Sequence, residues 1–475
     1  AGQGGYGAVM GSKRLKAIAV RGTGGVPIAD PGRLMDLALG SSRETMSFRR
    51  GNRPRRWPGG EIPAARHMKK CGFCASKCGS YRYMAAPNVT STGSHTVHPF
   101  CYRFRQEDMA ASVEIAALAG DLGLNGWETA YGVIPWLQMC RQEGLIDADA
   151  ARAALDGLDI PVPEAKIEKL RDTAPVSAEF SHTLLHKMAT REGEWGDALA
   201  DGACYAAERL FDGKGLPLLD YIYPRRAGQT SHWNAHWIHP VRFPFLMAPL
   251  LQWCTDTRDP ASDAIHGYAQ HMLTYLPYPA WEGEGAVTLE QARAVCEKVY
   301  GEPDACDPAY TYDRPETKAI PAMYHHHRAT VNNCMVLCER ETIRVFSMES
   351  EDYAADTALM AKLYEASTGE KMSEADLDVA GERVYNLLRA IDVRNHGRAR
   401  NGPSSHSDWA TVADMIGPSI PDGVPLDLER FSMVLDCYYE LRGWNPENGW
   451  PTRARLETLG LQDVADELER VGKLG

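Results

Sequence analysis

The chain has 475 residues, a formal net charge of −12 and 44% hydrophobic residues, which allows two or three domains with hydrophobic cores. The acidic balance without a Lys/Arg-rich run argues against a nucleic-acid partner, and no apolar stretch is long enough to span a bilayer. Its 12 cysteines are too sparse for a small disulfide-stapled secreted domain, so we expect a cytoplasmic protein.

The first 30 residues combine a glycine-rich loop with an apolar segment, "KAIAVRG", at residues 16–22. This segment predicts a buried strand. A single strand cannot satisfy its own edges, so its partners should lie upstream of a chain that lacks an initiator Met. We therefore expect residues 1–30 to be the remnant of a β-rich N-terminal domain of a larger protein.

From residue 31 onward the pattern is mainly α-helical. Residues 107–120 begin with acidic side chains, place small apolar residues at helical spacing and end on Gly, which are helix signals. The helical sequence pattern is interrupted near residue 210, so we predict one helical domain over residues 31–210 and a second over 211–475. Further helices are expected within residues 163–174, 181–210, 288–301, 355–369 and 374–395.

Three cysteines lie close together in "CGFCASKC", where Cys71, Cys74 and Cys78 form a Cys-x2-Cys-x3-Cys run. Closely spaced thiolates of this kind suit a 4Fe–4S cluster, which needs a fourth ligand. A distant segment, "NNCMVLCERE", offers Cys334 and Cys338. The spacing alone leaves both candidates open.

Several separated motifs together resemble the tungsten-containing aldehyde:ferredoxin oxidoreductase family. They are "GGYGAVMGSKRLKAIAVRGTG" at the start, the cysteine run, "GDLGLNGWE" at residues 120–128, "NCMVLC" at residues 333–338 and the closing "YYELRGWNPENGWPTRARLETLGL". The resemblance implies that Cys338 is the fourth cluster ligand. It also implies two helical domains of that family's type behind a β domain that cradles the cofactor.

The resemblance further implies an enzyme that oxidises an aldehyde to a carboxylic acid and passes electrons to ferredoxin or to an iron–sulfur partner subunit, as a homo-oligomer or heteromer. Its cofactors would be tungsten (or molybdenum) held by two pterins, Mg²⁺ bridging the pterin phosphates, and the 4Fe–4S cluster. The implied cofactor-binding residues are Gly4 and Gly5 at the phosphates, Asp121, Gly123, Leu124 and Asn125 at the first pterin turn, and Asn333 and Leu337 at the second.

The chemistry of the matched residues agrees with these roles. Gly123 lets the backbone approach a flat ring, and Asp121 and Asn125 offer groups that can hydrogen-bond its edge. The alternative for "DLGLNG" is a Gly-ended helix followed by an Asn cap of the next helix. The chain has Gln3, Asn333 and Val336 at positions where the family has Arg, Asp and Gly. Since Val disfavours positive φ, we expect the second turn to be reshaped.

The family's active-site glutamate has no counterpart, because no Glu occurs between residues 61 and 107. Ungapped spacing from the first pterin turn places that position on His95, with His98 and Cys101 as alternatives. A second family histidine near the metal maps to His239, with His236 as its rival. Histidine titrates near neutrality and can exchange the proton that aldehyde oxidation requires.

The run "YHHHRATVNNC" at residues 324–334 is predicted to be a loop at the entrance or near the cluster rather than a zinc site, because three adjacent side chains cannot all face one ion. Two other functions stay open. One is the tungsten subunit of a benzoyl-CoA reductase-like enzyme acting on an aromatic acyl-CoA, a group that also lacks the glutamate. The other is a helical protein with a structural metal and no redox chemistry.

Overall fold

The computed structural model describes residues 6–50, 65–67, 81–86, 89–92, 109–126, 128–167, 172–221, 245, 247–256, 268–269, 271–276, 286–308, 312–337, 342–402, 407–409 and 427–475. The described chain is mainly helical, as predicted, and forms two compact units. The first comprises Ala1–Gly25, Pro54–Arg225 and Thr230–Asn234, and the second comprises Val26–Arg53, Arg226–Gln229 and Ala235–Gly475. The boundaries predicted at residues 30 and 210 stay predictions.

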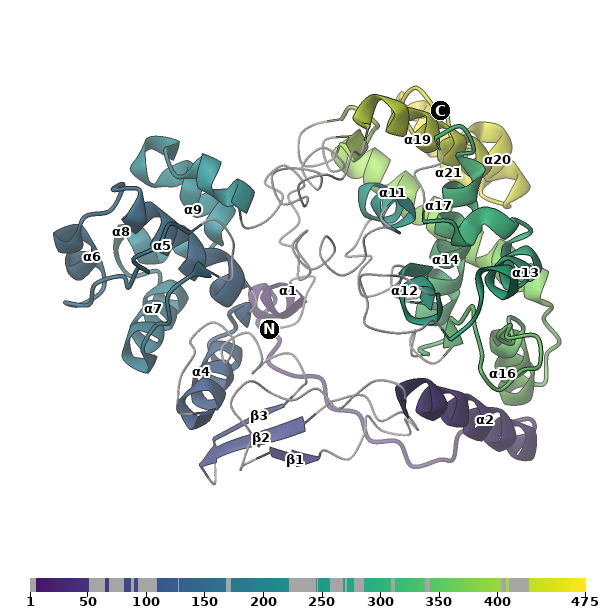
Figure 1. Ribbon diagram of the computed structural model, residues 1–475, viewed down its shortest axis with the longest axis horizontal. Coiled ribbons are helices and arrows are strands. Elements are labelled where there is room, and N and C mark those ends of the chain that lie inside the picture. Colours follow the sequence, from purple (N-terminus) through teal and green to yellow (C-terminus); the bar gives the residue numbers. More distant parts are fainter. Residues whose placement is uncertain are drawn as a thin grey trace. The chain divides into compact units, whose positions relative to one another are not determined.

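Unit 1 combines a group of short helices with a small antiparallel sheet (Figure 1). The sheet has the order β1-β2-β3 and was not predicted; α4 packs against β2 and β3. Its elements are α1 (Tyr6–Ser12), β1 (Ala65–His67), β2 (Tyr81–Ala86), β3 (Val89–Thr92), α4 (Met109–Asp121), the π-helix η1 (Glu128–Val133), α5 (Ile134–Gln142), α6 (Ala148–Ala154), α7 (Ala178–Thr190), α8 (Gly193–Leu199), α9 (Ala203–Arg209) and the 3₁₀ helices η3 (Phe211–Gly213) and η4 (Leu216–Tyr221).

The core of unit 1 lies among α4, α5, α7 and α9. Trp136 is fully buried there and donates from Nε1 to the carbonyl oxygen of Gly215 at 2.9 Å. A Cβ at position 215 would lie 2.8 Å from the Trp136 ring, so glycine is needed for this close approach.

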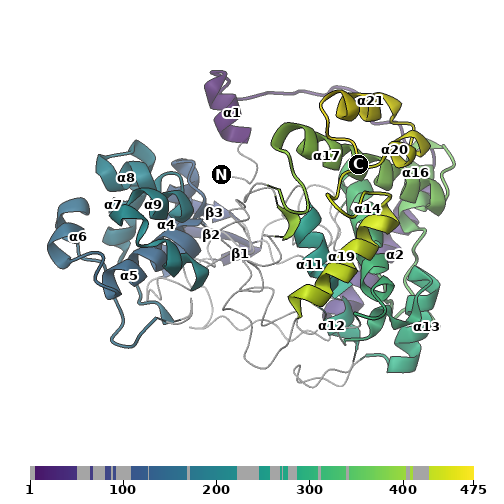
Figure 2. The same cartoon turned by 90° about the horizontal axis from the view of Figure 1, so that it is seen from above.

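Unit 2 is built around the long helix α14 (Glu316–Cys334), which packs against α11, α17 and α19 (Figures 1 and 2). A Cβ at Gly381 of α17 would lie 2.5 Å from the carbonyl oxygen of His327, so glycine permits the close contact of the two helices. The other elements are α2 (Pro31–Arg50), α11 (Met247–Thr255), α12 (His271–Tyr275), α13 (Leu289–Tyr300), the 3₁₀ helix η6 (Pro303–Cys306), α16 (Leu359–Thr368), α17 (Glu374–His396), α19 (Leu428–Arg442), α20 (Arg453–Thr458) and α21 (Gln462–Arg470).

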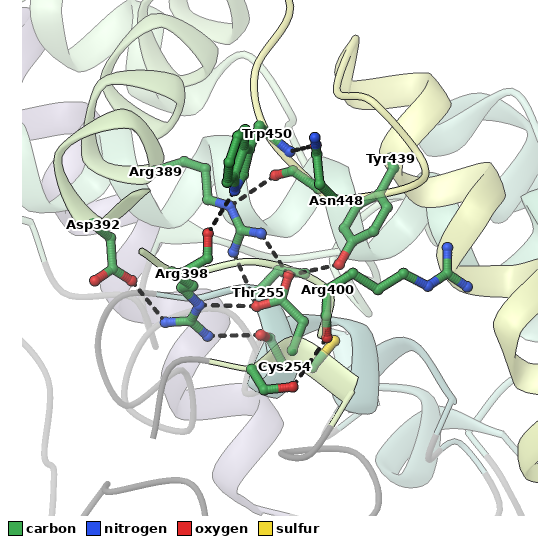
Figure 3. A network of polar contacts seen from close by, with 12 residues as sticks. Cys254, Thr255, Arg389, Asp392, Arg398, Arg400, Tyr439, Asn448 and Trp450 are labelled. Carbon is green, nitrogen blue, oxygen red and sulfur yellow. Dashed lines mark hydrogen bonds and ion pairs between the residues drawn. The ribbon is translucent and has the colours of Figure 1, made fainter. Parts of the chain in front are cut away.

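A fully buried carboxylate joins several segments of unit 2 (Figure 3). Asp408 accepts two hydrogen bonds from Arg389 of α17 (3.0 and 2.6 Å), one from Arg398 Nε (2.9 Å) and one from the Tyr439 hydroxyl of α19 (2.6 Å). Arg398 also donates to the carbonyl oxygen of Cys254 in α11 at 2.6 Å. The paired charges therefore connect α11, α17 and α19 inside the core.

The strand predicted at residues 16–22 was expected to pair with partners outside these 475 residues, so it stays a prediction. Residues 16–22 are irregular and exposed, with Ile18 73% and Val20 89% accessible. They pair with none of the described strands, and a strand exists only with a hydrogen-bonded neighbour. The glycine-rich segment before them contains the exposed helix α1 instead of only a loop.

The helix predicted within residues 163–174 is not formed over residues 163–167, which are irregular. The side chain of Gln142 donates to the carbonyl oxygens of Pro163 (3.3 Å) and Ala165 (2.8 Å) and accepts from the Ile167 N–H (2.8 Å). These bonds to a neighbouring helix replace the ones that a local helix would make.

Strong helix signals predicted correct elements elsewhere. The ranges predicted at residues 107–120, 288–301, 355–369 and 374–395 correspond to α4, α13, α16 and α17, although α4 and α17 each extend one residue further. Residues 181–210 contain parts of three helices, which are separated by residues with positive φ at Arg191 and Gly202. In the described part of the chain no helix is both long and apolar enough to cross a membrane.

Candidate functional site

The first predicted pterin turn is the C-terminal end of α4. Gly123 has φ +73°, and its N–H donates to the Gly120 carbonyl at 3.1 Å. The Leu124 N–H donates to the Ala119 carbonyl at 2.8 Å. This pair of bonds around a left-handed residue is a Schellman motif. No heavy atom of the described chain lies within 4 Å of a Cβ built at Gly123, so the backbone is open to a flat ligand there.

Asn125 connects this turn to the next helix. Its Oδ1 accepts from the Glu128 N–H at 3.3 Å, and its carbonyl oxygen accepts from both the N–H and the hydroxyl of Thr129 at 3.0 Å. The Gly-ended helix and Asn cap that the sequence offered as an alternative are therefore both present. They are compatible with ligand binding, because Asp121 is exposed beside the same turn.

The second predicted turn is the C-terminal end of α14 and has the same hydrogen-bond pattern. The Leu337 N–H donates to the Asn332 carbonyl at 2.9 Å, and the Val336 N–H donates to the Asn333 carbonyl at 3.2 Å. Val336 has φ +56°. The expectation that valine would reshape this turn is wrong: the Val336 side chain is 90% exposed, so it accepts the left-handed conformation without a packing clash.

The side chain of Asn332 holds the second turn in place, and sequence reasoning missed it. This buried amide donates from Nδ2 to the Leu337 carbonyl at 2.8 Å and accepts from the Thr342 hydroxyl. One side chain thus fixes residues on both sides of positions 338–341. Its partners lie five and ten residues further along the chain, and no local pattern identifies such a contact. Asn333 and Cys334 beside it are exposed.

The remaining predicted site residues lie outside the described residues, so their roles stay predictions. Among the described side chains, no group of three or more His, Cys, Asp and Glu residues could hold a metal ion. The predicted residues concerned are Gly4 and Gly5, the cluster cysteines Cys71, Cys74, Cys78 and Cys338, and the histidines His95 and His239, together with their alternatives His98, Cys101 and His236.

The histidine run at residues 325–327 was predicted to be a loop, and this is wrong. All three histidines are buried within α14. His325 Nε2 lies 2.8 Å from the Tyr300 hydroxyl, and Arg442 donates to His326 Nδ1 (3.0 Å) and His327 Nε2 (2.6 Å). Successive residues of a helix point about 100° apart, so His325 meets Tyr300, whereas His326 and His327 share the Arg442 guanidinium.

These histidines are neutral. Burial lowers the pKa of His325 and His327 well below their usual range, and it also lowers the pKa of His326. Because a guanidinium only donates, the two ring nitrogens that Arg442 contacts must be unprotonated. The Nε2–H of His326 then faces Asp256 Oδ2 at 3.4 Å. The run stabilises the interior of unit 2 and is not a metal site.

The two turns fit the pterin groups that the sequence resemblance implies. Each presents exposed backbone at a helix end, and each is held by hydrogen bonds that leave its outer face accessible. Asp121 and Asn333 would hold pterin edge groups there, and Cys338 follows directly after Leu337.

Comparison with known proteins gives the family. The family described as aldehyde ferredoxin oxidoreductase, domains 2 & 3, matches residues 45–461. The chain therefore belongs to the aldehyde ferredoxin oxidoreductase family and is an enzyme of the oxidoreductase class.

Similar proteins include the tungsten-containing aldehyde ferredoxin oxidoreductases of Pyrococcus furiosus (24% identity, 98% of this chain and 69% of the relative) and Pyrococcus horikoshii (23% identity, 98% and 70%). A solved structure, the active site complex BamBC of benzoyl coenzyme A reductase with 1,5-dienoyl-CoA, is similar with a TM-score of 0.65 at 19% identity. That similarity covers 99% of this chain and 71% of the solved chain. At this identity it shows a shared fold.

Proposed function

We propose that this chain belongs to a tungsten- (or molybdenum-) pterin enzyme that oxidises an aldehyde to a carboxylic acid. Per turnover, aldehyde and water give carboxylic acid, two protons and two electrons. The observation that supports this most strongly is the family match over residues 45–461, which includes both helix-ending turns at residues 121–125 and 333–337.

The residues have separate tasks in this proposal. Gly4 and Gly5 would hold the pterin phosphates and Mg²⁺, and the two turns would hold the pterins themselves. Cys71, Cys74, Cys78 and Cys338 would hold a 4Fe–4S cluster, which would supply electron transfer to ferredoxin or to an iron–sulfur partner subunit. The bound metal would accept the two electrons of the reaction.

Proton transfer is assigned to the histidines. His95 accepts a proton from the hydrated aldehyde through a neutral ring nitrogen, and His239 holds a hydrogen bond to the reacting oxygen. Two histidines in one cavity each disfavour protonation of the other, so one stays neutral near pH 7 and can act as the base.

The test uses the protein from its complete gene, assayed for aldehyde oxidation with an artificial electron acceptor from pH 5 to 9. His95→Ala should lower turnover by ~100-fold to 10,000-fold, the range for loss of a general base. His98→Ala, three residues away, is the matched control and should retain most of the activity. Activity that depends on His98 and not on His95 would contradict the assignment of the base.

A second candidate is reduction of an aromatic acyl-CoA. The similarity to the benzoyl coenzyme A reductase complex favours it, as does the missing glutamate between residues 61 and 107. The same preparation should be assayed for dienoyl-CoA oxidation. Turnover of the dienoyl-CoA and of no aldehyde would replace the first proposal with this one. Iron and acid-labile sulfide in the preparation would exclude the structural-metal alternative.

A further inference from the structure

Glu128 links the first turn to a helix far along the chain. It is the first residue of the π-helix η1, and its N–H donates to Asn125 Oδ1 at 3.3 Å. Its carboxylate Oε1 accepts from the N–H of Ala203, the first residue of α9, at 2.9 Å. One residue therefore contacts both the end of the turn and a segment 75 positions later.

The N-terminus of α9 favours this contact with the Glu128 carboxylate. The first N–H groups of a helix have no partner within the helix and carry partial positive charge. The residue before α9 is Gly202, which supplies no side-chain cap, so the Glu128 carboxylate takes that role. A Cβ at position 202 would lie 3.0 Å from Glu128 Oε1, and Gly202 has φ +96°. Glycine thus allows the carboxylate to approach.

The segments joined to the turn are packed into the core of unit 1. Thr129 to Val133 of η1 are buried, as are Ala203 and Ala206 of α9, and both elements contribute to the core of unit 1. Short π-helical segments are uncommon and often lie at functional sites. The π-helix places Glu128 one residue outside the core, where its carboxylate reaches α9 and its N–H holds Asn125.

We propose that Glu128 is a positioning residue for the first pterin turn. It fixes Asn125, and with it residues 121–125, relative to the core of unit 1, so that the turn is held in its binding conformation before the pterin arrives. This inference rests on the proposed function, because it assigns the turn to a pterin. It adds a residue, and a contact with α9, that the turn itself does not contain.

The experiment compares three variants of the protein from its complete gene. Glu128→Ala removes the carboxylate, Glu128→Gln keeps an oxygen that can accept from Ala203, and Asp147→Ala is the matched control. Asp147 caps α6 of the same unit by accepting from the Ala150 N–H at 2.7 Å and contacts neither the turn nor α9. Two quantities are measured: hydrogen exchange of the amides of residues 119–129, and pterin per protein after acid release and oxidation.

We expect Glu128→Ala to speed exchange at residues 124–129 and to lower pterin content by about 10-fold or more, the scale seen when outer-shell partners of a bound group are removed. Glu128→Gln should stay within about twofold of the parent, and Asp147→Ala should match the parent in pterin. Should Glu128→Ala fail to fold, Gly202→Ala tests the same contact, since the added methyl group would lie 3.0 Å from Glu128 Oε1 and crowd the carboxylate against Ala203. It should lower pterin content in the same direction.

The outcomes separate this inference from the proposed function. A parent that contains pterin together with a Glu128→Ala variant that retains it overturns the inference alone. An equal loss of pterin in Asp147→Ala also overturns it, because the effect would then be general destabilisation. A parent protein without pterin overturns the proposed function and this inference with it. This holds even if the amides of residues 124–129 exchange faster in Glu128→Ala, as predicted.

Discussion

Replacing Val336 by glycine should stabilise unit 2, although the substitution removes three carbon atoms. Val336 has φ +56°, a conformation that costs an L-residue roughly 1–2 kcal/mol. Its side chain is 90% exposed, so little hydrophobic burial is lost. Glycine has more freedom in the unfolded chain, which offsets about 0.5–1 kcal/mol of the gain. The net expectation is an increase of about 0.5–1 kcal/mol in the free energy of unfolding.

The matched variant is Gly123→Val in the first turn, where the sign should reverse. Gly123 has φ +73°, and the space beside it is open, so the substitution adds conformational strain without a steric clash. It should cost about 1–2 kcal/mol. Calorimetry of both variants measures the effect, and a gain near 1 kcal/mol corresponds to a rise of about 2 °C in the melting temperature of a large domain.

Two results would refute this reasoning. A lower melting temperature for Val336→Gly would mean that the valine makes a stabilising contact despite its exposure. A neutral Gly123→Val variant would mean that a left-handed residue is not required at the end of α4. The amide of Leu337 offers a local check, because its hydrogen bond to Asn332 should exchange more slowly in Val336→Gly.

Three further predictions concern the interior of unit 2 and use four variants. Burial lowers the pKa of His271 to about 3, so the contribution of this histidine to stability is present above the unfolded pKa near 6.5 and is lost as the pH falls below it. Urea denaturation should therefore show about 2 kcal/mol less stability at pH 5 than at pH 7 from this group. The variant His271→Asn should lack this part of the pH dependence. Asp408→Asn should cost about 3–5 kcal/mol in the same assay, because it leaves two buried arginines without their carboxylate. Asn332→Ala should lower the iron content of the complete protein. The control Asn386→Ala removes another buried amide with two hydrogen bonds and should leave the iron content unchanged. Equal iron in the two variants would contradict the role of Asn332 in holding the second turn.

The sequence predicted those features that depend on local signals. The ends of α13 and α17 carry capping boxes and a terminal glycine, and both helices were found. The end of α4 at Gly123 and the Asn125 cap were also readable, because each depends on residues within one turn. The motifs identified the family for the same reason.

Two of the failures involve partners that are distant in sequence. Residues 163–167 are irregular because Gln142 takes their backbone hydrogen bonds. The histidine run at 325–327 looked like a polar loop because its partners Tyr300 and Arg442 cannot be foreseen from a local window. Burying a histidine without a hydrogen-bond partner would be costly, and the local sequence does not reveal such a partner. Three adjacent histidines are therefore expected at the surface.

The two turns reach one backbone geometry by different routes, and this bears on how the family signature should be interpreted. In the first turn, Gly123 adopts positive φ at no steric cost, and the hydrogen bond between Asn125 and Glu128 fixes the start of the next helix. In the second, valine bears the strained conformation while the Asn332 side chain adds two hydrogen bonds across it. A charge-neutral buried hydrogen bond contributes about 1 kcal/mol, so two such bonds are comparable with the strain at Val336. The left-handed backbone that the family's glycine would adopt is therefore retained at position 336, whereas the close backbone approach that glycine allows is lost to the exposed valine side chain.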